Sequence, residues 1–138
     1  MQHTLSILTF QTDGPGLYEV TEHVGEWIGG TGIGRGILTL LCQHTSAGLL
    51  ITENASSAVH RDLVRWLDAA APEGPGYEHE EEGPDDMPAH VKSAIVGNSL
   101  TVPVADRRML LGTWQGVFIA EHRREPQIRS LAAHLLGD

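Results

Sequence analysis

The sequence has almost no cysteine: Cys42 carries the only thiol among its 138 residues. An intrachain disulfide is therefore excluded, which is typical of proteins kept in a reducing compartment. Long hydrophobic runs are also missing, because no stretch approaches the roughly 20 apolar residues of a membrane span. The start of the chain, from Met1 to Leu8, has neither the basic nor the apolar segment of a secretory signal. We therefore expect a cytoplasmic protein with Cys42 buried in its core.

Basic residues are scarce. Nine lysines and arginines stand against 18 aspartates and glutamates, and the formal net charge is −9. Such a chain repels polyanions, so we expect neither nucleic acid nor an anionic membrane as a partner. A small anion is a different case, because salt screens charges beyond about 8 Å and local cations or a helix N-terminus can hold a phosphate.

The length and composition fit a single domain over residues 1–138. Hydrophobic residues make up 41% of the chain and charged residues 20%, as in ordinary globular domains. A chain of this length buries roughly two thirds of the surface that its unfolded form exposes, so it needs no disulfide or structural metal to fold. A bound metal would therefore serve function.

The spacing of hydrophobic residues predicts an α+β fold, with an antiparallel sheet or pair of sheets and about three packed helices. Alternating or dense apolar residues predict strands at 3–11, 36–43, 47–53, 99–104, 109–112, 116–123 and 128–136. Apolar residues three and four positions apart predict helices at 21–28, 57–70 and 87–96. A hairpin turn is expected at 105–107. The glycines between 29 and 34 lack the spacing of a nucleotide-binding loop.

The predicted helix at 57–70 has one apolar face, which we expect to pack on the core. Its members are Val59, Leu63, Trp66, Leu67 and Ala70. The segment 72–84 that follows is polar, acidic and rich in glycine and proline. Loops of this length are uncommon in compact domains and are often functional.

Three histidines lie where predicted elements begin or end. His44 lies between two strands, His79 in the acidic loop and His90 at the start of the next helix. A bend at Gly83–Pro84 would bring the imidazoles together, and three histidines with an open position suit zinc or another first-row divalent ion. We predict that they converge in one pocket. The spacing matches no compact metal motif, so a surface position for His90 is the alternative.

Carboxylates and one guanidinium surround these histidines in the sequence. Asp85 and Asp86 are each suited to cap the helix, so one of them is free to orient a metal-bound histidine. The strand at 116–123 places Glu121 and Arg123 on one face, where the pair can orient a ligand phosphate or a histidine. A surface ion pair is the alternative for these two. The acidic run 80–82 would also attract Mg²⁺.

Three strings of the sequence resemble blocks of a known family. They are QHTSAGLLITENAS, EGPDDMPAHVKSAIVGNSLTVPV and GTWQGVFIAEHR. Each is similar to a block of the YjbQ-like family, whose members are known as secondary thiamine-phosphate synthase enzymes. The resemblance implies a compact α+β homotrimer and a polar pocket that holds metal or anions in some members. It also implies a weak ability to form thiamine phosphate.

The residue types and the resemblance together assign roles to the candidate site. We predict catalytic roles for His44, His90, Asp86 and Glu121. Substrate binding is predicted for Thr45, Ser46, Asn54, Gln115 and Arg123. Ligation of a divalent metal, Zn²⁺ or Mg²⁺, is predicted for His44, His79 and His90.

Three functions suit these residues. The favoured one is an enzyme that acts on a small phosphorylated substrate, in which Mg²⁺ or the cations Arg123 and Lys92 would neutralise a leaving pyrophosphate. The second is a trimeric metal- or anion-binding module without turnover. The third is metal-dependent hydrolysis, which an open three-histidine site also allows. The sequence leaves all three open.

Overall fold

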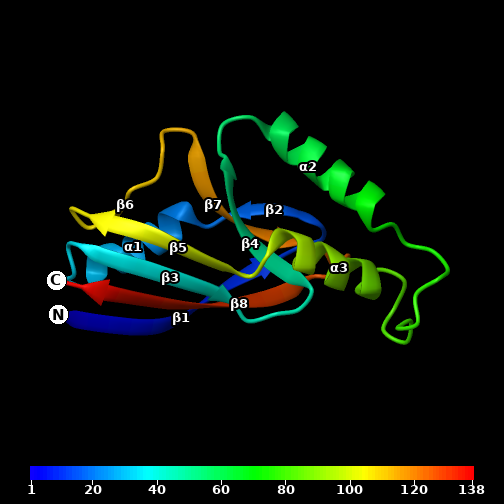
Figure 1. Ribbon diagram of the computed structural model, residues 1–138, viewed down its shortest axis with the longest axis horizontal. Coiled ribbons are helices and arrows are strands. Elements are labelled where there is room, and N and C mark those ends of the chain that lie inside the picture. The colour runs from blue at the N-terminus through cyan, green and yellow to red at the C-terminus, as the bar shows by residue number, and fades with distance from the viewer.

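The computed structural model describes residues 1–138 and confirms the predicted α+β class, with two antiparallel sheets and three helices (Figure 1). The larger sheet has the strand order β1-β8-β3-β5-β6. Its strands are β1 (Gln2–Thr12), β8 (Gln127–Gly137), β3 (Gly36–Cys42), β5 (Ser99–Ala105) and β6 (Arg108–Met109). The first and last strands pair from Gln2 opposite Gly137 to Thr12 opposite Gln127.

The smaller sheet has the strand order β2-β7-β4. Its strands are β2 (Gly16–Glu19), β7 (Gln115–Glu121) and β4 (Ala47–Glu53). The central strand, β7, is buried along six of its seven residues. Strand β2 was not predicted, because its four residues are too few for an alternating pattern to show.

The core forms where the two sheets turn their apolar faces inward. Strand β3 illustrates the alternation: Leu38, Leu40 and Cys42 are buried, whereas Ile37 and Leu41 are exposed. Successive side chains of a strand point to opposite faces, so this pattern places one face in the core and the other outside. The expected burial of Cys42 is confirmed.

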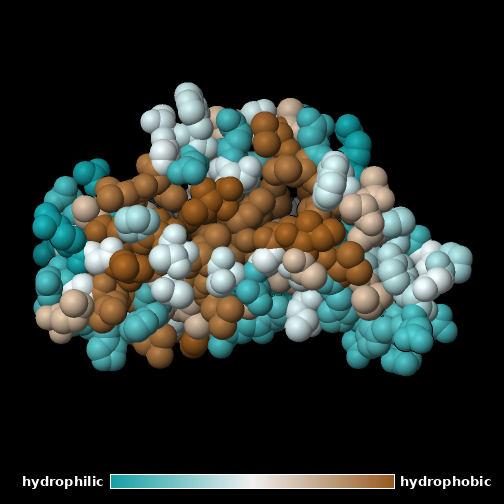
Figure 2. All heavy atoms as spheres, in the orientation of Figure 1, coloured by the Kyte–Doolittle hydropathy of each residue, from teal (hydrophilic) through white to brown (hydrophobic).

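The outer face of the larger sheet carries apolar side chains that nothing in the chain covers. We call the set Leu5, Ile7, Ile37, Leu41 and Leu136 the outer apolar face; all five are at least 41% exposed. Figure 2 shows hydrophobic residues gathered across the middle of one face of the molecule, with hydrophilic residues at its two ends. An uncovered apolar area of this kind is typical of a surface that contacts another protein.

Helices α1 (Thr21–Gly30) and α3 (Asp86–Val96) are held closely against the strands. Helix α1 buries Val24 and Ile28. The end of α3 approaches β4 at Gly48, where an added Cβ would lie 2.3 Å from the carbonyl oxygen of Gly97. That oxygen accepts a hydrogen bond from the amide of Leu49 at 3.1 Å. Glycine at position 48 therefore allows the close approach that fixes α3 relative to β4.

Helix α2 (Ser57–Ala70) has the predicted bounds but not the predicted packing. Only Leu67 is buried, and Trp66 is 62% exposed. The expectation that the whole apolar face packs on the core was wrong. Figure 1 shows α2 at the periphery, away from the larger sheet. Helical spacing indicates which residues share a face of the helix, but not which part of the molecule covers that face.

None of the three helices is long and apolar enough to cross a membrane.

Two strand ends differ from the prediction. The hairpin turn is confirmed, with φ of 50° at Asp106 and 61° at Arg107, but β6 ends at Met109 and does not reach 112. Strand β7 ends at Glu121, because the amides of His122 and Arg123 donate hydrogen bonds to the Glu121 carboxylate. The Glu121 side chain accepts the hydrogen bonds that a backbone carbonyl of a neighbouring strand would otherwise accept.

Candidate metal centre

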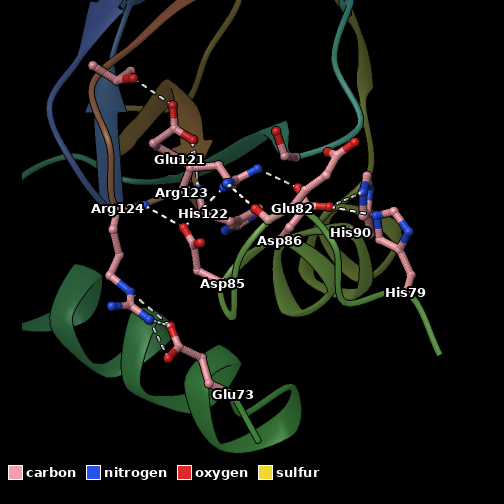
Figure 3. A network of polar contacts seen from close by, with 12 residues as sticks. Glu73, His79, Glu82, Asp85, Asp86, His90, Glu121, His122, Arg123 and Arg124 are labelled. Atoms are coloured by element: carbon pink, nitrogen blue, oxygen red, sulfur yellow. Dashed lines mark hydrogen bonds and ion pairs between the residues drawn. The ribbon is translucent and has the colours of Figure 1, made fainter. Parts of the chain in front are cut away.

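Two histidines and one carboxylate meet at the start of α3 (Figure 3). Asp86 and His90 are one helical turn apart and so share a face of α3, and His79 reaches them from the acidic loop. Asp86 Oδ2 lies 2.9 Å from His79 Nε2 and 3.1 Å from His90 Nε2. One ligand atom of each residue lies within 4.8 Å of the other two. We call His79, Asp86 and His90 the candidate centre.

The contacts of the His90 ring indicate that a positive charge is needed between His90 and Asp86. Its Nδ1 lies 3.0 Å from the carbonyl oxygen of Thr45, which can only accept, so Nδ1 carries the proton. In neutral His90 the Nε2 lone pair then faces an oxygen of the Asp86 carboxylate. Two acceptors at this distance repel each other unless a proton or a cation lies between them. The centre therefore needs either an imidazolium or a bound cation.

The donor set fits a first-row divalent ion. Two imidazole nitrogens and one carboxylate oxygen form a common zinc ligand set with an open fourth position. Bonds of about 2.1 Å in a tetrahedral site would separate the ligand atoms by about 3.4 Å, which is slightly longer than the 2.9 Å and 3.1 Å contacts of Asp86 and within the 4.8 Å that contains all three ligand atoms. Mg²⁺ prefers an all-oxygen environment, and the two nitrogens disfavour it.

Arg123 holds the acidic loop and the centre together. Its Nη1 donates to Asp86 Oδ1, its Nε to Asp85 Oδ2 at 3.0 Å and its Nη2 to the Glu82 carbonyl at 3.1 Å. Burial by itself would raise the pKa of Asp85, but hydrogen bonds from the Arg124 amide and from Arg123 outweigh it and lower that pKa. Asp85 occupies the N-cap position without capping the helix through its side chain, so the predicted cap is corrected to an ion pair.

His44 lies outside the candidate centre, and the predicted set of three histidines is corrected. Its Nε2 accepts a hydrogen bond of 2.8 Å from the amide of Ser130, which occupies the lone pair that a metal would need. Burial lowers the pKa of His44, and the nearby positive charge of Arg129 lowers it further. Asp86 is the third member of the candidate centre instead. It is 3% exposed, a degree of burial that the sequence pattern of α3 did not indicate.

A pocket of about 230 Å³ nevertheless connects His44 to the centre. It is lined by His44, Thr45, His90, Ser93, Ala94 and Asn98. The Ser93 hydroxyl is buried without a hydrogen-bond partner. His90 thus belongs both to the centre and to this neighbouring pocket, which offers hydroxyl, amide and imidazole groups to a ligand.

Glu121 pairs with Arg129, a partner that the sequence analysis missed. Arg129 Nε donates to Glu121 Oε1 at 2.7 Å, and Thr12 Oγ1 donates to the same oxygen at 2.5 Å. Burial would raise the pKa of Glu121, but the hydrogen bonds from Arg129 and Thr12 lower it below its usual value. Arg129 also binds the Ser46 hydroxyl at 3.0 Å. The Arg123 amide donates to the Glu121 carboxylate, but the two side chains have different partners, Asp85 and Asp86 for Arg123 and Arg129 for Glu121.

Asn54 and Gln115 lie at the opposite end of the smaller sheet from Glu121. Asn54 Nδ2 donates to the Gln115 carbonyl at 3.2 Å. The register of β4 and β7 runs from Glu53 opposite Gln115 to Ala47 opposite Glu121. Seven residues of strand span about 20 Å, so these two predicted substrate-binding residues do not meet the candidate centre within one chain.

His122 is buried beside the site, and its only signal in the sequence is its place in the EHR string. It is 6% exposed. Burial and, next, the charge of Lys92 lower its pKa to about 4, so its imidazole is neutral at ordinary pH.

Comparison with known proteins identifies the family of the chain. A model of the family described as UPF0047 protein YjbQ-like matches residues 6–138. The chain belongs to the YjbQ-like family. It is 40% identical to a UPF0047 protein of Synechocystis over 96% of this chain and 90% of that one. It is also 40% identical to YjbQ of Salmonella typhimurium over 89% of this chain and 90% of that one.

Solved YjbQ-like structures share the fold. A YjbQ/UPF0047 family protein from Clostridium acetobutylicum superposes with a TM-score of 0.87 at 28% identity, covering 95% of this chain and 99% of that one. A conserved hypothetical protein from Thermus thermophilus superposes with a TM-score of 0.86 at 31% identity, with the same coverage. The family and the α+β fold predicted from the three strings are therefore confirmed.

Proposed function

We propose that this YjbQ-like protein is an enzyme that binds a first-row divalent ion at His79, Asp86 and His90 and acts on a small phosphorylated substrate. The observation that carries the proposal is the meeting of the His90 Nε2 lone pair with the Asp86 carboxylate at 3.1 Å. The Asp86 carboxylate is 3% exposed, and Arg123 binds only its Oδ1, so Oδ2 is left facing the imidazole nitrogens. A divalent ion between the two acceptors would satisfy both of them.

The residues around the centre have definable tasks. When bound, a divalent ion supplies Lewis-acid stabilisation of negative charge on a phosphoryl oxygen or a leaving group. The Thr45 carbonyl fixes the His90 tautomer through the 3.0 Å contact at Nδ1. Arg123 orients Asp86 and neutralises part of its charge. The pocket lined by His44, Thr45, Ser93 and Asn98 offers polar groups beside the centre, where a substrate would be positioned.

The finer proposal is a weak thiamine-phosphate synthase activity, in which a thiazole phosphate nitrogen displaces pyrophosphate from an aminopyrimidine methylene. Its support is the family resemblance together with a site that combines a cation centre and a polar pocket. A binding module without turnover uses the same residues, and only a measurement of product separates the two.

The first prediction tests the metal. Calorimetric titration of the purified chain should show Zn²⁺ binding that is abolished in His90→Ala, because one of three ligands is lost. The affinity should also fall as the pH is lowered, because protons compete with the cation for the imidazole lone pairs. His23→Ala, which changes an exposed histidine on α1, is the matched control and should bind as the unchanged protein does.

Activity is measured on the same variants. The enzyme proposal expects His90→Ala to lose product formation while it keeps its fold and its oligomeric state. Tight Zn²⁺ binding without any turnover of phosphorylated substrates would support the binding module. Equal Zn²⁺ affinity in His90→Ala and the unchanged protein would refute the centre itself.

A further inference from the structure

A second polar cavity lies on the other side of α3 from the candidate centre. It has a volume of about 350 Å³, and its polar lining residues are Asp68, Glu73, Asp85, Lys92, His122 and Arg124. His90 does not line it. Lys92 follows His90 by two positions, which is about 200° around a helix, so the two side chains leave α3 on opposite sides. The volume lies within the range of small-molecule sites.

His122 gives this cavity an unsatisfied polar group. The side chain lines the cavity and is 6% exposed, and its Nε2 is buried without any hydrogen-bond partner. A buried polar atom left unpaired costs roughly 1–3 kcal/mol. A protein that keeps such an atom at the wall of a cavity gains when a ligand completes the hydrogen bond.

Lys92 adds a buried cation with unused donors. The residue is 9% exposed, and its ammonium donates to Asp68 Oδ1 at 2.6 Å. An ammonium has three N–H donors, and no second acceptor for Lys92 is present within the chain. Asp68 itself is 60% exposed, so water can take over its solvation if a ligand displaces it.

The carboxylates that line the cavity already have partners. Asp85 accepts from Arg123 at 3.0 Å and from the Arg124 amide at 2.9 Å, and Glu73 is paired with the Arg124 guanidinium. Three carboxylates thus line the cavity together with Lys92 and Arg124, and Arg123 behind Asp85 is shared between Asp85 and Asp86. What remains unused is donor capacity at Lys92 and the unpaired Nε2 of His122, which donates in the tautomer that carries its proton on that nitrogen.

We propose that this cavity is a second ligand site, which binds the phosphate group of a small molecule through Lys92 and His122. Because Lys92 and His122 have unused N–H donors, the cavity favours a ligand with acceptor atoms. A phosphate offers more acceptor oxygens than a carboxylate and a higher negative charge to pair with Lys92. The site stands apart from the metal centre and does not depend on it. Arg123 links the two, since it binds both Asp85 at the cavity wall and Asp86 in the centre.

The test uses inorganic phosphate as the probe and the full chain with metal removed by a chelator. Calorimetry at constant ionic strength should show one saturable phosphate site per chain, with acetate at least tenfold weaker. Lys92→Met, which keeps the length and apolar stem of the side chain, should weaken phosphate binding roughly tenfold or more. Arg65→Met removes a cation of α2 that is 78% exposed and should leave binding unchanged.

Two further measurements keep the proposal falsifiable. His90→Ala, which disables the metal centre, should bind phosphate as the unchanged chain does, so this site and the proposed function can fail separately. In the unchanged chain, phosphate should move the NMR signals of the His122 imidazole and leave those of His3 in place, whether or not Lys92→Met folds. Absence of saturation at millimolar phosphate, equal binding of acetate, or shifts at His79 and His90 alone would overturn the proposal.

Discussion

Asp86 has two kinds of partner at once, a guanidinium on one carboxylate oxygen and two imidazoles on the other. The ion pair with Arg123 offsets the desolvation cost of burying the carboxylate, and it also fixes the direction of the second oxygen. At the scale of single residues, the fixed Oδ2 of Asp86 is the atom that both His79 of the loop and His90 of the helix contact.

Glu121 supports a second prediction at this scale. Its side chain is fully buried and paired with Arg129, so Glu121→Gln leaves an uncompensated buried cation and should lower the free energy of unfolding by about 3 kcal/mol. The folded-state pKa of Glu121 is lowered, so its contribution is present above its unfolded value and is lost as the pH falls through the folded value. Urea unfolding at neutral and acidic pH measures both effects.

The matched control is Asp62→Asn. Asp62 pairs with Arg65 at 3.4 Å on the surface of α2, with both side chains at least 74% exposed. An exposed pair contributes less than about 1 kcal/mol, so this change should be nearly neutral. A similar loss in both variants would contradict the structural role assigned to Glu121.

The sequence predicted single residues of the site better than their partners. His79 and His90 were placed together because a bend in the loop allowed it, and the structure confirms that contact. His44 was added on the same reasoning and lies outside the centre, because the strand pairing that brings the Ser130 amide to its Nε2 is a long-range contact. Arg129 was missed for the same reason: nothing local links it to Glu121.

At the scale of elements, the position of α3 depends on Gly48. In Gly48→Ala the new Cβ would meet the Gly97 carbonyl oxygen, and the backbone must shift because that atom is not a flexible side chain. We expect a loss of about 1–3 kcal/mol in stability. A weaker Zn²⁺ affinity should follow, because α3 carries Asp86 and His90. Thermal unfolding and calorimetry measure the two.

Gly25→Ala in α1 is the control for this prediction. An added Cβ there meets nothing within 4 Å, and alanine favours a helix over glycine by roughly 0.5–1 kcal/mol. Stability should therefore rise slightly and metal affinity should stay the same. If both alanine variants gave the same result, the close approach at Gly48 would not be what places α3.

Element types followed from the sequence because long helices and strands have clear periods. The bounds of α2 came from such a period, and the burial of Cys42 was expected from the dense apolar run in which it lies. The packing of Trp66 did not, since a period is a local property, whereas burial depends on what the rest of the molecule places opposite the face.

At the scale of the whole molecule, three features favour contact with another copy of the chain, and the family resemblance suggests that the assembly is a homotrimer. The outer apolar face and Trp66 are exposed in the single chain, and Asn54 and Gln115 lie about 20 Å along the sheet from the other predicted site residues. A neighbouring copy would cover apolar surface and could bring the two groups of residues together.

Light scattering tests the assembly, and the expected mass is three times the 14.9 kDa of one chain. If the site is shared between copies, mixing His90→Ala chains with Gln115→Ala chains should restore part of the activity that each variant lacks alone, because some mixed sites contain neither change. A monomer across micromolar concentrations would contradict the trimer. An assembled trimer without restored activity would place each site within one chain.

Strand β7 has a consequence for regulation. From Phe118 to Glu121 it is hydrogen-bonded to β2 on one edge and to β4 on the other, which makes it rigid. It begins at Gln115 and ends at Glu121, so a predicted site residue lies at each end of the strand. In a trimer whose sites lie between copies, the β7 strand of one copy would contribute a residue to each of two neighbouring sites. Filling one site would then change the affinity of the next, and binding curves would depart from a simple hyperbola.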